Sequence, residues 1–484
     1  MAVGLCLALS SLPGCRSGED PRGCGTLRLG ARASATSVVL NVGDAMRRDV
    51  ADLYGGEAHT PILRSFADTG VVFERAYTQA PWTKPSIATL FTGFYPSQHR
   101  VATHNEGRPG TGRLREARET DVLSSSFATL AETYKEAGFA TAAFVSNPWL
   151  DKGYGFSQGF DVYRDSFARW DAPGSLVSLA AADWIEELDP VQPFFLYLHY
   201  LEPHRPYGPL ERGETLEKAD ALNADDRPLN EEAVRAIHAN SDFADGASAL
   251  DSRVRPTLAL LELAYAKGVE NFDRALGEFV SAYTRVRDRH ATAWVVTSDH
   301  GESLFAHGIG NHGTTLFEDE VAIPLIMSLP GVEAQGVRSD CPLGLVDLMP
   351  FLCNYSGLSC PGDLAGRDVL TEGAQAPTRY LISEGVRGSG RHRTLIGERY
   401  KLVYAPDWPG LRNRPYRFFD LVEDPGEEQD WVEIQPNALV GHEAFERMRR
   451  ELPAAVAPYT APTPELRELD PEIVERLEAL GYLD

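Results

Sequence analysis

The chain has 484 residues, more than one hydrophobic core usually organises, so we expect one large domain and a smaller appended one. The net charge of -24 argues against a nucleic-acid partner, because binding a phosphate backbone requires Lys and Arg. The sequence after the N-terminus holds no apolar run long enough to predict a membrane-spanning helix. An anionic substrate would need local positive charge, and a bound metal ion would supply it.

The first residues resemble a bacterial lipoprotein signal. Residues 1–11 are short and apolar, and Leu12-Pro13-Gly14-Cys15 leads into a polar stretch. Cys15 would then carry the lipid and attach an exported, periplasmic protein to a membrane. The usual basic residues before the apolar run are missing and Pro13 is unusual at this place, which a start codon assigned too late would explain in part. Residues 16–36 are rich in Gly, Arg and Ser and are predicted to be a tether.

Strand-like and helix-like segments alternate through the next three hundred residues. The predicted strands are residues 37–44, 71–74, 140–147, 193–200 and 293–298, and the predicted helices are 59–68, 123–137 and 258–287. Residues 210–255 are polar and acidic and are expected to form a surface excursion with short helices. The alternation predicts an α/β domain at residues 37–360, with a mixed, mostly parallel central sheet between two layers of helices.

The remainder, residues 361–484, has a different texture. Short β-like pieces at 400–404 and 417–421 predict a small antiparallel sheet, and residues 471–483 predict an amphipathic helix. Together they are expected to form a small C-terminal subdomain. A disulfide between Cys353 and Cys360 is plausible in an exported protein, and buried thiols are the alternative.

The apolar run at residues 293–298 ends on Asp299 and His300. Such runs are typical of parallel strands covered on both faces, and open α/β sheets bind ligands beyond the carboxyl ends of these strands. A carboxylate beside an imidazole suits a divalent ion of the zinc or manganese kind. Residues 37–44 also form a strand that ends in an acid, Asp44, so the two strand ends predict one shared site. Taken alone, the Asp299-His300 pair favours a simpler interpretation, a polar turn after a core strand.

Residues 81–93 place the hydroxyl of Thr83 ahead of Pro85, Ser86 and a helical run. A nucleophile at a helix N-terminus has this pattern, because the free amides and the helix dipole favour an alkoxide and the anion it attacks. On local sequence alone, a simpler interpretation is favoured, in which Thr83 is only the N-cap of the helix.

Taken in order, these segments resemble the sulfatase branch of the alkaline phosphatase superfamily over residues 36–330. Thr83, Pro85 and Thr92-Gly93 keep the spacing of the family's nucleophile motif. Asp44 and the residues after it resemble the family's first metal motif, and residues 298–302 resemble the second. The other matching segments are His199 and His204 within 198–207, His312-Gly313, 419–427 and 477–482.

The chain departs from the usual sulfatase pattern at the nucleophile. Sulfatases place Cys or Ser there, oxidised to formylglycine, with Arg four residues on, where this chain has Thr83 and Ile87. Oxidising threonine at Cβ would give a ketone, so no formylglycine is expected. Ala45 replaces a metal-binding acid or amide of many relatives, and Ala322 replaces a common Arg.

What remains resembles family members that use threonine, such as lipoteichoic acid synthases and phosphoethanolamine transferases. The resemblance implies one divalent ion, Zn, Mn or Ca, held by Asp44, Thr83, Asp299 and His300. It implies Thr83 as the nucleophile, with His204 and His312 holding or protonating substrate oxygens. The candidate substrate-binding residues are His199, His307, Lys84 and Asn147, although a strand histidine bonded to a backbone carbonyl is an equal interpretation of His199.

We therefore expect a metal-dependent hydrolase of phosphate or sulfate esters that works through a covalent intermediate on Thr83. Threonine favours phosphorus over sulfur. A transferase of alcohol phosphates in the cell envelope shares this machinery, but the transferases of this kind usually carry several membrane spans. A binding protein that has kept the fold and lost turnover is the third alternative, motivated by Ala45, Ile87 and Ala322. The expected partner is a phosphorylated or sulfated small molecule, lipid or glycan.

Overall fold

The computed structural model describes residues 36–101, 119–165, 167, 173–205, 207, 255–308, 312–332, 336–368, 379–385, 392–406, 415–456 and 464–479. Cys15 and nearly all of the predicted excursion at residues 210–255 lie outside this part of the chain. Within it, no helix is long and apolar enough to cross a membrane.

Eight strands of the described residues form one central sheet, in the order β10-β2-β9-β8-β1-β7-β5-β6. Their bounds are β1 Val38–Gly43, β2 Val71–Phe73, β5 Ala140–Val145, β6 Val162–Arg164, β7 Phe194–Tyr200, β8 Ala293–Ser298, β9 Leu325–Ser328 and β10 Val337–Ser339. Only β9 among them runs against its neighbours, β8 and β2, and every other pairing is parallel. The predicted mixed, mostly parallel sheet is confirmed.

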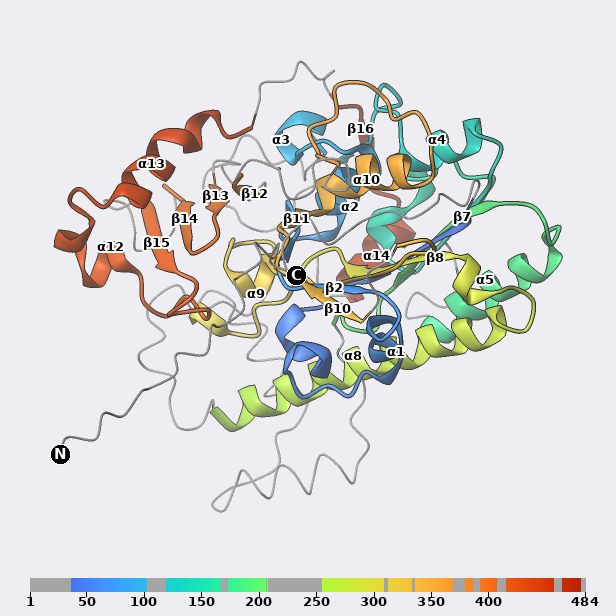
Figure 1. Ribbon diagram of the computed structural model, residues 1–484, viewed down its shortest axis with the longest axis horizontal. Coiled ribbons are helices and arrows are strands. Elements are labelled where there is room, and N and C mark those ends of the chain that lie inside the picture. Colours follow the sequence, from blue (N-terminus) through green and yellow to red (C-terminus); the bar gives the residue numbers. More distant parts are fainter. Residues whose placement is uncertain are drawn as a thin grey trace, which may run out of the picture.

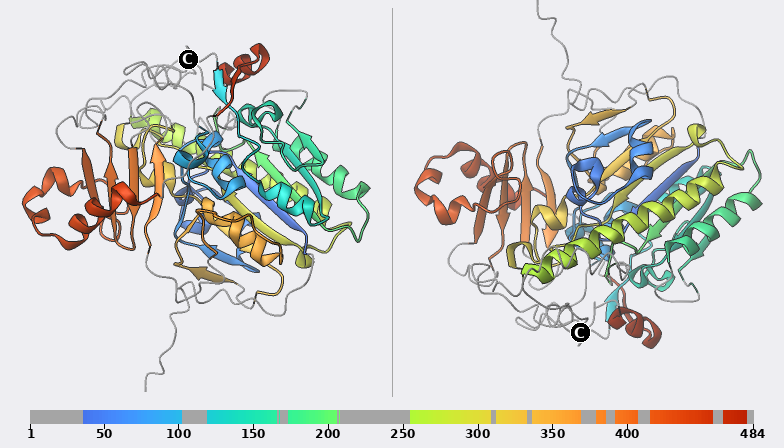
Figure 2. Two further views of the ribbon diagram at one scale, coloured as in Figure 1. Left: turned by 90° about the horizontal axis from the view of Figure 1, so that it is seen from above. Right: turned by 90° about the horizontal axis from the view of Figure 1, so that it is seen from below.

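Helices cover both faces of this sheet (Figure 1). One layer holds α1 Pro61–Ala67, α5 Gly174–Glu187 and the long α8 Arg255–Tyr283, and the other holds α2 Thr83–Thr92, α4 Leu130–Glu136 and α10 Leu348–Tyr355. Figure 2 shows α5 and α8 crossing the sheet in the view from below. Because side chains alternate along a strand, Phe195 and Tyr197 of β7 join the core under α2, while Phe194 and Leu196 join the core under α8. His199 comes two residues after Tyr197 on the same strand, so its side chain also faces α2.

The predicted helix at residues 123–137 is shorter than expected, because α4 begins at Leu130. Thr129 and Glu132 form a reciprocal capping box, in which the Thr129 side chain accepts from the Glu132 amide and the Glu132 carboxylate accepts from the Thr129 amide. A capping box satisfies backbone donors that have no partner inside the helix, so it defines the helix start. The other predicted helices and strands of the described residues lie within a few residues of their observed positions.

The predicted antiparallel sheet of the C-terminal part is confirmed, and Figure 1 shows it beside the large sheet. It consists of β12 Leu381–Gly385, β13 His392–Ile396, β14 Tyr400–Tyr404 and β15 Tyr416–Asp420, and α12 Trp431–Ile434 and α13 Glu443–Glu451 follow it in the chain. Shorter elements of the large domain are α3 Pro96–His99, α9 Glu318–Val321 and the paired β3 Ala76–Tyr77 and β11 Leu343–Gly344.

The last described elements return to the large domain. The strand β16 Leu466–Glu468 pairs with β4 Glu119–Asp121, and α14 Pro471–Ala479 buries Ile473 and Leu477 in the core under α2. The domain boundary at residue 360 stays a prediction, but this terminal segment packs apart from the small sheet.

The disulfide expected between Cys353 and Cys360 is not formed, because both residues are free thiols. The Cys360 thiol lies 3.9 Å from the carbonyl oxygens of Met349 and Pro350 and donates toward them. Cys341 is the cysteine of the described residues that takes part in a disulfide.

Candidate active site

Polar side chains lie at the carboxyl ends of four neighbouring strands, at one edge of the sheet. Asp44 follows β1, Asp299 follows β8, Asn147 comes two residues after β5, and His199 is near the end of β7. Because β8, β1, β7 and β5 are adjacent and parallel, their carboxyl ends meet, which is where open α/β sheets bind ligands. All four side chains are buried.

Each of the two carboxylates has one oxygen with hydrogen-bond donors and one without. Oδ2 of Asp44 accepts from His199 Nε2 at 2.8 Å and from Asn147 Nδ2, while Oδ1 of Asp299 accepts from the amides of Ala45 at 3.0 Å and His300 at 2.9 Å. The opposite oxygens, Asp44 Oδ1 and Asp299 Oδ2, are buried and have no hydrogen-bond donor among the described residues. Buried charge without a partner is costly, so this pair of oxygens is a candidate cation site.

His300 completes this site from β8. Its Nδ1 lies 2.7 Å from the carbonyl oxygen of Gly301 and must donate to it, so in the neutral imidazole Nε2 carries a lone pair. Nε2 lies 3.5 Å from Asp299 Oδ2 and 3.8 Å from Asp44 Oδ1. Ligands about 2.1 Å from a tetrahedral zinc ion are about 3.4 Å apart, so the distances from His300 Nε2 to the two carboxylate oxygens are close to what such an ion requires.

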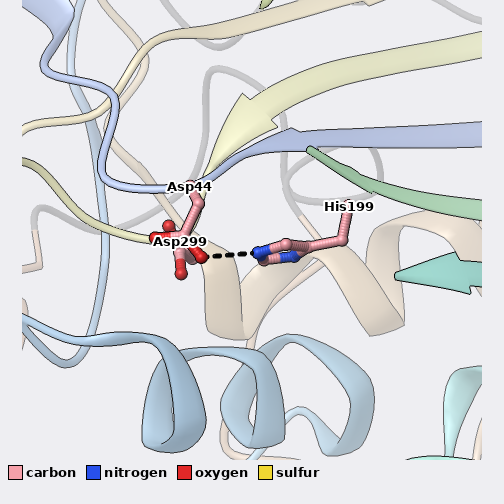
Figure 3. Close-up of side chains that lie close together, drawn as sticks. All are labelled: Asp44, His199 and Asp299. Carbon is pink, nitrogen blue, oxygen red and sulfur yellow. Dashed lines mark hydrogen bonds and ion pairs between the residues drawn. The ribbon is translucent and has the colours of Figure 1, made fainter. Parts of the chain in front are cut away.

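His199 also lies within reach of this site, since the candidate ligand atoms of Asp44, His199 and Asp299 are all within 4.8 Å of one another (Figure 3). Its Nε2 must carry the proton, however, because it faces the carboxylate oxygen of Asp44, and its Nδ1 accepts from the Tyr197 hydroxyl at 2.7 Å. Burial raises the pKa of Tyr197 well above its ordinary value, so this hydroxyl keeps its proton. His199 thus contacts Tyr197 and Asp44 and no backbone carbonyl of the described residues, unlike one of the two sequence interpretations, and its part in substrate binding stays a prediction.

Thr83 is the first residue of α2, and its hydroxyl faces the strand ends. Trp82 occupies the N-cap position and makes no side-chain cap, so the interpretation of Thr83 as only an N-cap is wrong. The Thr83 Oγ1 atom lies 3.4 Å from His300 Nε2 and accepts from Asn147 Nδ2 at 3.2 Å. The helix start is tied to the sheet edge by Ser86, whose hydroxyl donates to the Asp299 carbonyl at 2.6 Å.

Two further histidines lie above this set. The ring of His312 has its centroid 4.4 Å from that of His300 and 5.1 Å from that of His204. Its Nδ1 contacts Glu302 Oε2 at 3.1 Å. Burial lowers the pKa of His204, which favours its neutral form. Glu302 was given no role by the sequence, although it closes the segment that carries Asp299 and His300.

The structure does not bring Lys84 and His307 into this set. Lys84 is one residue beyond Thr83 on the helix, so its side chain leaves at a different angle, and its ammonium donates to Thr120 Oγ1 and the Asp121 carbonyl. The ring of His307 stacks on that of Phe317 with centroids 3.7 Å apart. Burial lowers the pKa of Lys84 to about 7 and that of His307 to about 4.

Ala45 contributes through its backbone, although its side chain offers no ligand. It adopts the left-handed conformation with φ of 56°, which turns its amide toward Asp299 Oδ1 and its carbonyl toward the Tyr265 hydroxyl at 2.6 Å. The departure from the family at this position therefore removes a ligand side chain and keeps a contact that orients Asp299.

The fold and the site define an ester hydrolase of the alkaline-phosphatase-like architecture. The sequence profile of the sulfatase family matches residues 36–358, which is well over half of the chain, so the protein belongs to the sulfatase family. Sulfatases are metal-dependent enzymes, in agreement with the acidic cluster at the sheet edge.

Among curated proteins, the chain is 22% identical to an arylsulfatase of Clostridium perfringens, over 81% of this chain and 89% of that protein. It is 26% identical to the uncharacterized sulfatase YidJ of Escherichia coli, over 79% and 82%. Among solved structures, the phosphonate monoester hydrolase of Agrobacterium radiobacter superposes with a TM-score of 0.65 at 20% identity, over 90% of this chain and all of that chain. BT4656, in complex with its substrate D-glucosamine-2-N,6-O-disulfate, also gives 0.65, at 16% identity over 87% and 98%.

Proposed function

We propose that the protein is a metal-dependent hydrolase of phosphate or sulfate esters in which Thr83 is the nucleophile. The observation that carries this proposal is the position of the Thr83 hydroxyl, 3.4 Å from His300 Nε2 and beside two buried carboxylate oxygens without donors. A hydroxyl in this place would be both a metal ligand and an attacking group.

Asp44 Oδ1, Asp299 Oδ2, His300 Nε2 and Thr83 Oγ1 would hold the ion. A bound divalent ion would lower the pKa of the threonine hydroxyl and neutralise charge on the ester oxygens. The imidazole donor favours zinc or manganese over calcium, which prefers oxygen ligands alone.

The chemistry on the chain's own residues has two steps. In the first, the proton of the Thr83 hydroxyl passes through His204 or His312 to the leaving alcohol oxygen, while Thr83 Oγ1 forms a bond to phosphorus and the bond to that alcohol breaks. In the second, water attacks phosphorus and the Oγ1–P bond breaks, and one proton of the water returns through the same histidine to restore the hydroxyl of Thr83. Asn147, which donates to Oγ1 at 3.2 Å, would orient the hydroxyl and stabilise its developing charge.

Phosphate esters are the favoured substrates within this proposal. A sulfatase of the usual kind relies on formylglycine, and threonine cannot become that aldehyde because its Cβ carries a methyl group. The names of similar proteins are consistent with both chemistries, since they include a phosphonate monoester hydrolase and a hexuronate sulfatase.

The test is a panel of nitrophenyl phosphate, a nitrophenyl phosphodiester and nitrophenyl sulfate, assayed with added zinc or manganese beside Thr83→Ala. We expect phosphoester turnover that depends on the metal and is lost in Thr83→Ala. Transfer of the phosphoryl group to an added alcohol in preference to water would support the transferase instead. Sulfate turnover that survives Thr83→Ala would contradict the nucleophile, and binding of metal and esters without any turnover would support a binding protein.

Export and attachment to a membrane through Cys15 are part of the same proposal. Mass spectrometry of the mature N-terminus tests it, with a lipid-modified Cys15 as the expected result.

A further inference from the structure

A short chain of hydrogen bonds lies beneath the metal-site carboxylate Asp44. Tyr197 and His199 are two residues apart on β7, so both side chains emerge on the face of the sheet that α2 covers. The Tyr197 hydroxyl lies 2.7 Å from His199 Nδ1, and His199 Nε2 lies 2.8 Å from Asp44 Oδ2. All three side chains are fully buried, so no water competes for these contacts.

The direction of each of these two hydrogen bonds follows from the carboxylate of Asp44, which is the last acceptor in the series. An ionised carboxylate only accepts, so His199 Nε2 must carry a proton. In the neutral imidazole Nδ1 is then an acceptor, and the Tyr197 hydroxyl donates to it. The opposite tautomer would place a lone pair of Nε2 against the oxygen of Asp44 and is therefore disfavoured.

We propose that Tyr197 and His199 are positioning residues that turn Asp44 toward the bound metal. The inference rests on the metal site of the proposed function. Asp44 Oδ2 receives one hydrogen bond from His199 and another from Asn147, so its orientation is determined by two donors on neighbouring strand ends. The remaining oxygen, Oδ1, is thereby left for the cation, beside Asp299 Oδ2 and His300 Nε2.

This role differs from that of a metal ligand, which the short distances around His199 would also permit. As a ligand, His199 would have to present the lone pair of Nε2 to the ion and give up its hydrogen bond to Asp44. As a positioning residue, it keeps Nε2–H and acts only through Asp44. Outer partners of this kind typically contribute about 10-fold to 100-fold to metal affinity.

The substitutions that separate the two roles are His199→Gln and His199→Leu. A glutamine amide can donate to Asp44 but is a poor zinc ligand, whereas leucine can do neither. Tyr197→Phe removes only the hydroxyl that selects the tautomer. Tyr134→Phe is the matched control, because Tyr134 of α4 is a buried tyrosine in the same core, and its hydroxyl bonds Ser356 at 2.6 Å and the Leu352 carbonyl instead of a residue of the site.

The experiment measures zinc affinity of the full chain by calorimetric titration and counts imidazole ligands by X-ray absorption at the zinc edge. We expect His199→Leu to weaken zinc binding about 10-fold to 100-fold. His199→Gln should recover most of this loss, Tyr197→Phe should lose a smaller factor, and Tyr134→Phe should match the wild type. The number of imidazoles around zinc should be the same in wild type and His199→Gln.

Two results would overturn the inference while leaving the metal site intact. One is a loss of one imidazole ligand in His199→Gln, which would make His199 a ligand. The other is an unchanged zinc affinity in His199→Leu, which would leave the hydrogen-bond chain without a role. A wild-type protein that binds neither zinc nor manganese would instead overturn the proposed function, and this inference with it.

Discussion

The Nε2 atom of His300 lies 3.4 Å from the hydroxyl oxygen of Thr83, although the two residues are 217 positions apart in the chain. One comes from the end of the strand β8 and the other from the first turn of the helix α2. The contact of Nδ1 with the carbonyl of Gly301 holds the imidazole so that Nε2 faces this hydroxyl and the carboxylates of Asp44 and Asp299. This contact joins the proposed metal ligands to the proposed nucleophile.

Replacing Thr83 by alanine should lower kcat for phosphate esters by about a thousandfold or more, because removing a covalent nucleophile costs at least this much in well-studied enzymes. Thr83→Ser keeps the hydroxyl and should retain measurable turnover. The matched control is Thr133→Val, which alters a buried threonine that bonds within its own helix region, to Thr129, and should leave kcat unchanged. Steady-state assays with nitrophenyl phosphate check all three variants, and equal activity of Thr83→Ala and Thr133→Val would contradict the assignment.

Replacing Asp299 by asparagine should weaken metal binding by about a hundredfold, because a neutral amide replaces an anionic ligand at a buried site. Elemental analysis and a titration with manganese measure the effect. Asp430→Asn is the control, since Asp430 is a buried aspartate of the C-terminal part that accepts from the amides of Phe418 and Val432. Unchanged metal occupancy in Asp299→Asn would remove this residue from the site.

The buried ammonium of Lys401 stabilises the junction between the small sheet and the large domain. It lies 3.0 Å from Glu318 Oε1 and 2.9 Å from Glu427 Oε1, and all of its side chain is buried. Among the described residues, Lys401→Met leaves Glu427 without its cation and Glu318 with Arg48 alone, whose Nη2 lies 3.6 Å from Glu318 Oε2. We therefore expect the free energy of unfolding to fall by about 3–5 kcal/mol.

Urea denaturation measures this loss, with Lys135→Met as the control. Lys135 pairs with Asp161 at 2.8 Å on the surface, where both side chains are nearly half exposed, so its loss should cost about 1 kcal/mol or less. If the free energy of unfolding fell equally in the two variants, the buried ion pairs of Lys401 would stabilise the fold no more than a surface pair does.

The carboxyl of Asp273 should make stability fall as pH rises from about 4 to 6. Burial raises the pKa of Asp273 to about 6, and the hydrogen bonds from the amides of Leu63 and Ile62 oppose this only in part. Between the unfolded and folded pKa values the folded state binds more protons, so the free energy of unfolding decreases with pH. The decrease is at most about 3 kcal/mol, since one pKa unit corresponds to about 1.4 kcal/mol.

The measurement is the free energy of unfolding of wild type and Asp273→Asn at several pH values between about 3.5 and 7. Their difference should narrow or reverse as Asp273 ionises, because the asparagine variant does not titrate. Parallel curves for the two proteins would mean that Asp273 has an ordinary pKa in the folded state.

Much of the architecture follows from local sequence patterns. The uninterrupted apolar run before Asp299 predicts a buried parallel strand because such a strand is covered on both faces, and β8 is buried along its whole length. The same pattern before Asp44 led to the prediction of a shared site. The start of α4 was misplaced because the pairing of Thr129 with Glu132 outweighs the apolar periodicity of the residues before it.

The sequence by itself determined the family and the order of strands, helices and motifs along the chain. It also identified the candidate residues of the metal site, Asp44, Thr83, Asp299 and His300. Residue type and spacing carry this information, because it resides in motifs of a few neighbouring residues. Only the tertiary structure decided which side chains share the site and in which role. In the structure, the Lys84 ammonium contacts Thr120, and the His307 ring stacks on Phe317. His199 contacts the carboxylate of Asp44 through Nε2. These outcomes depend on the direction in which each side chain leaves its strand or helix and on the partners that distant elements bring to it.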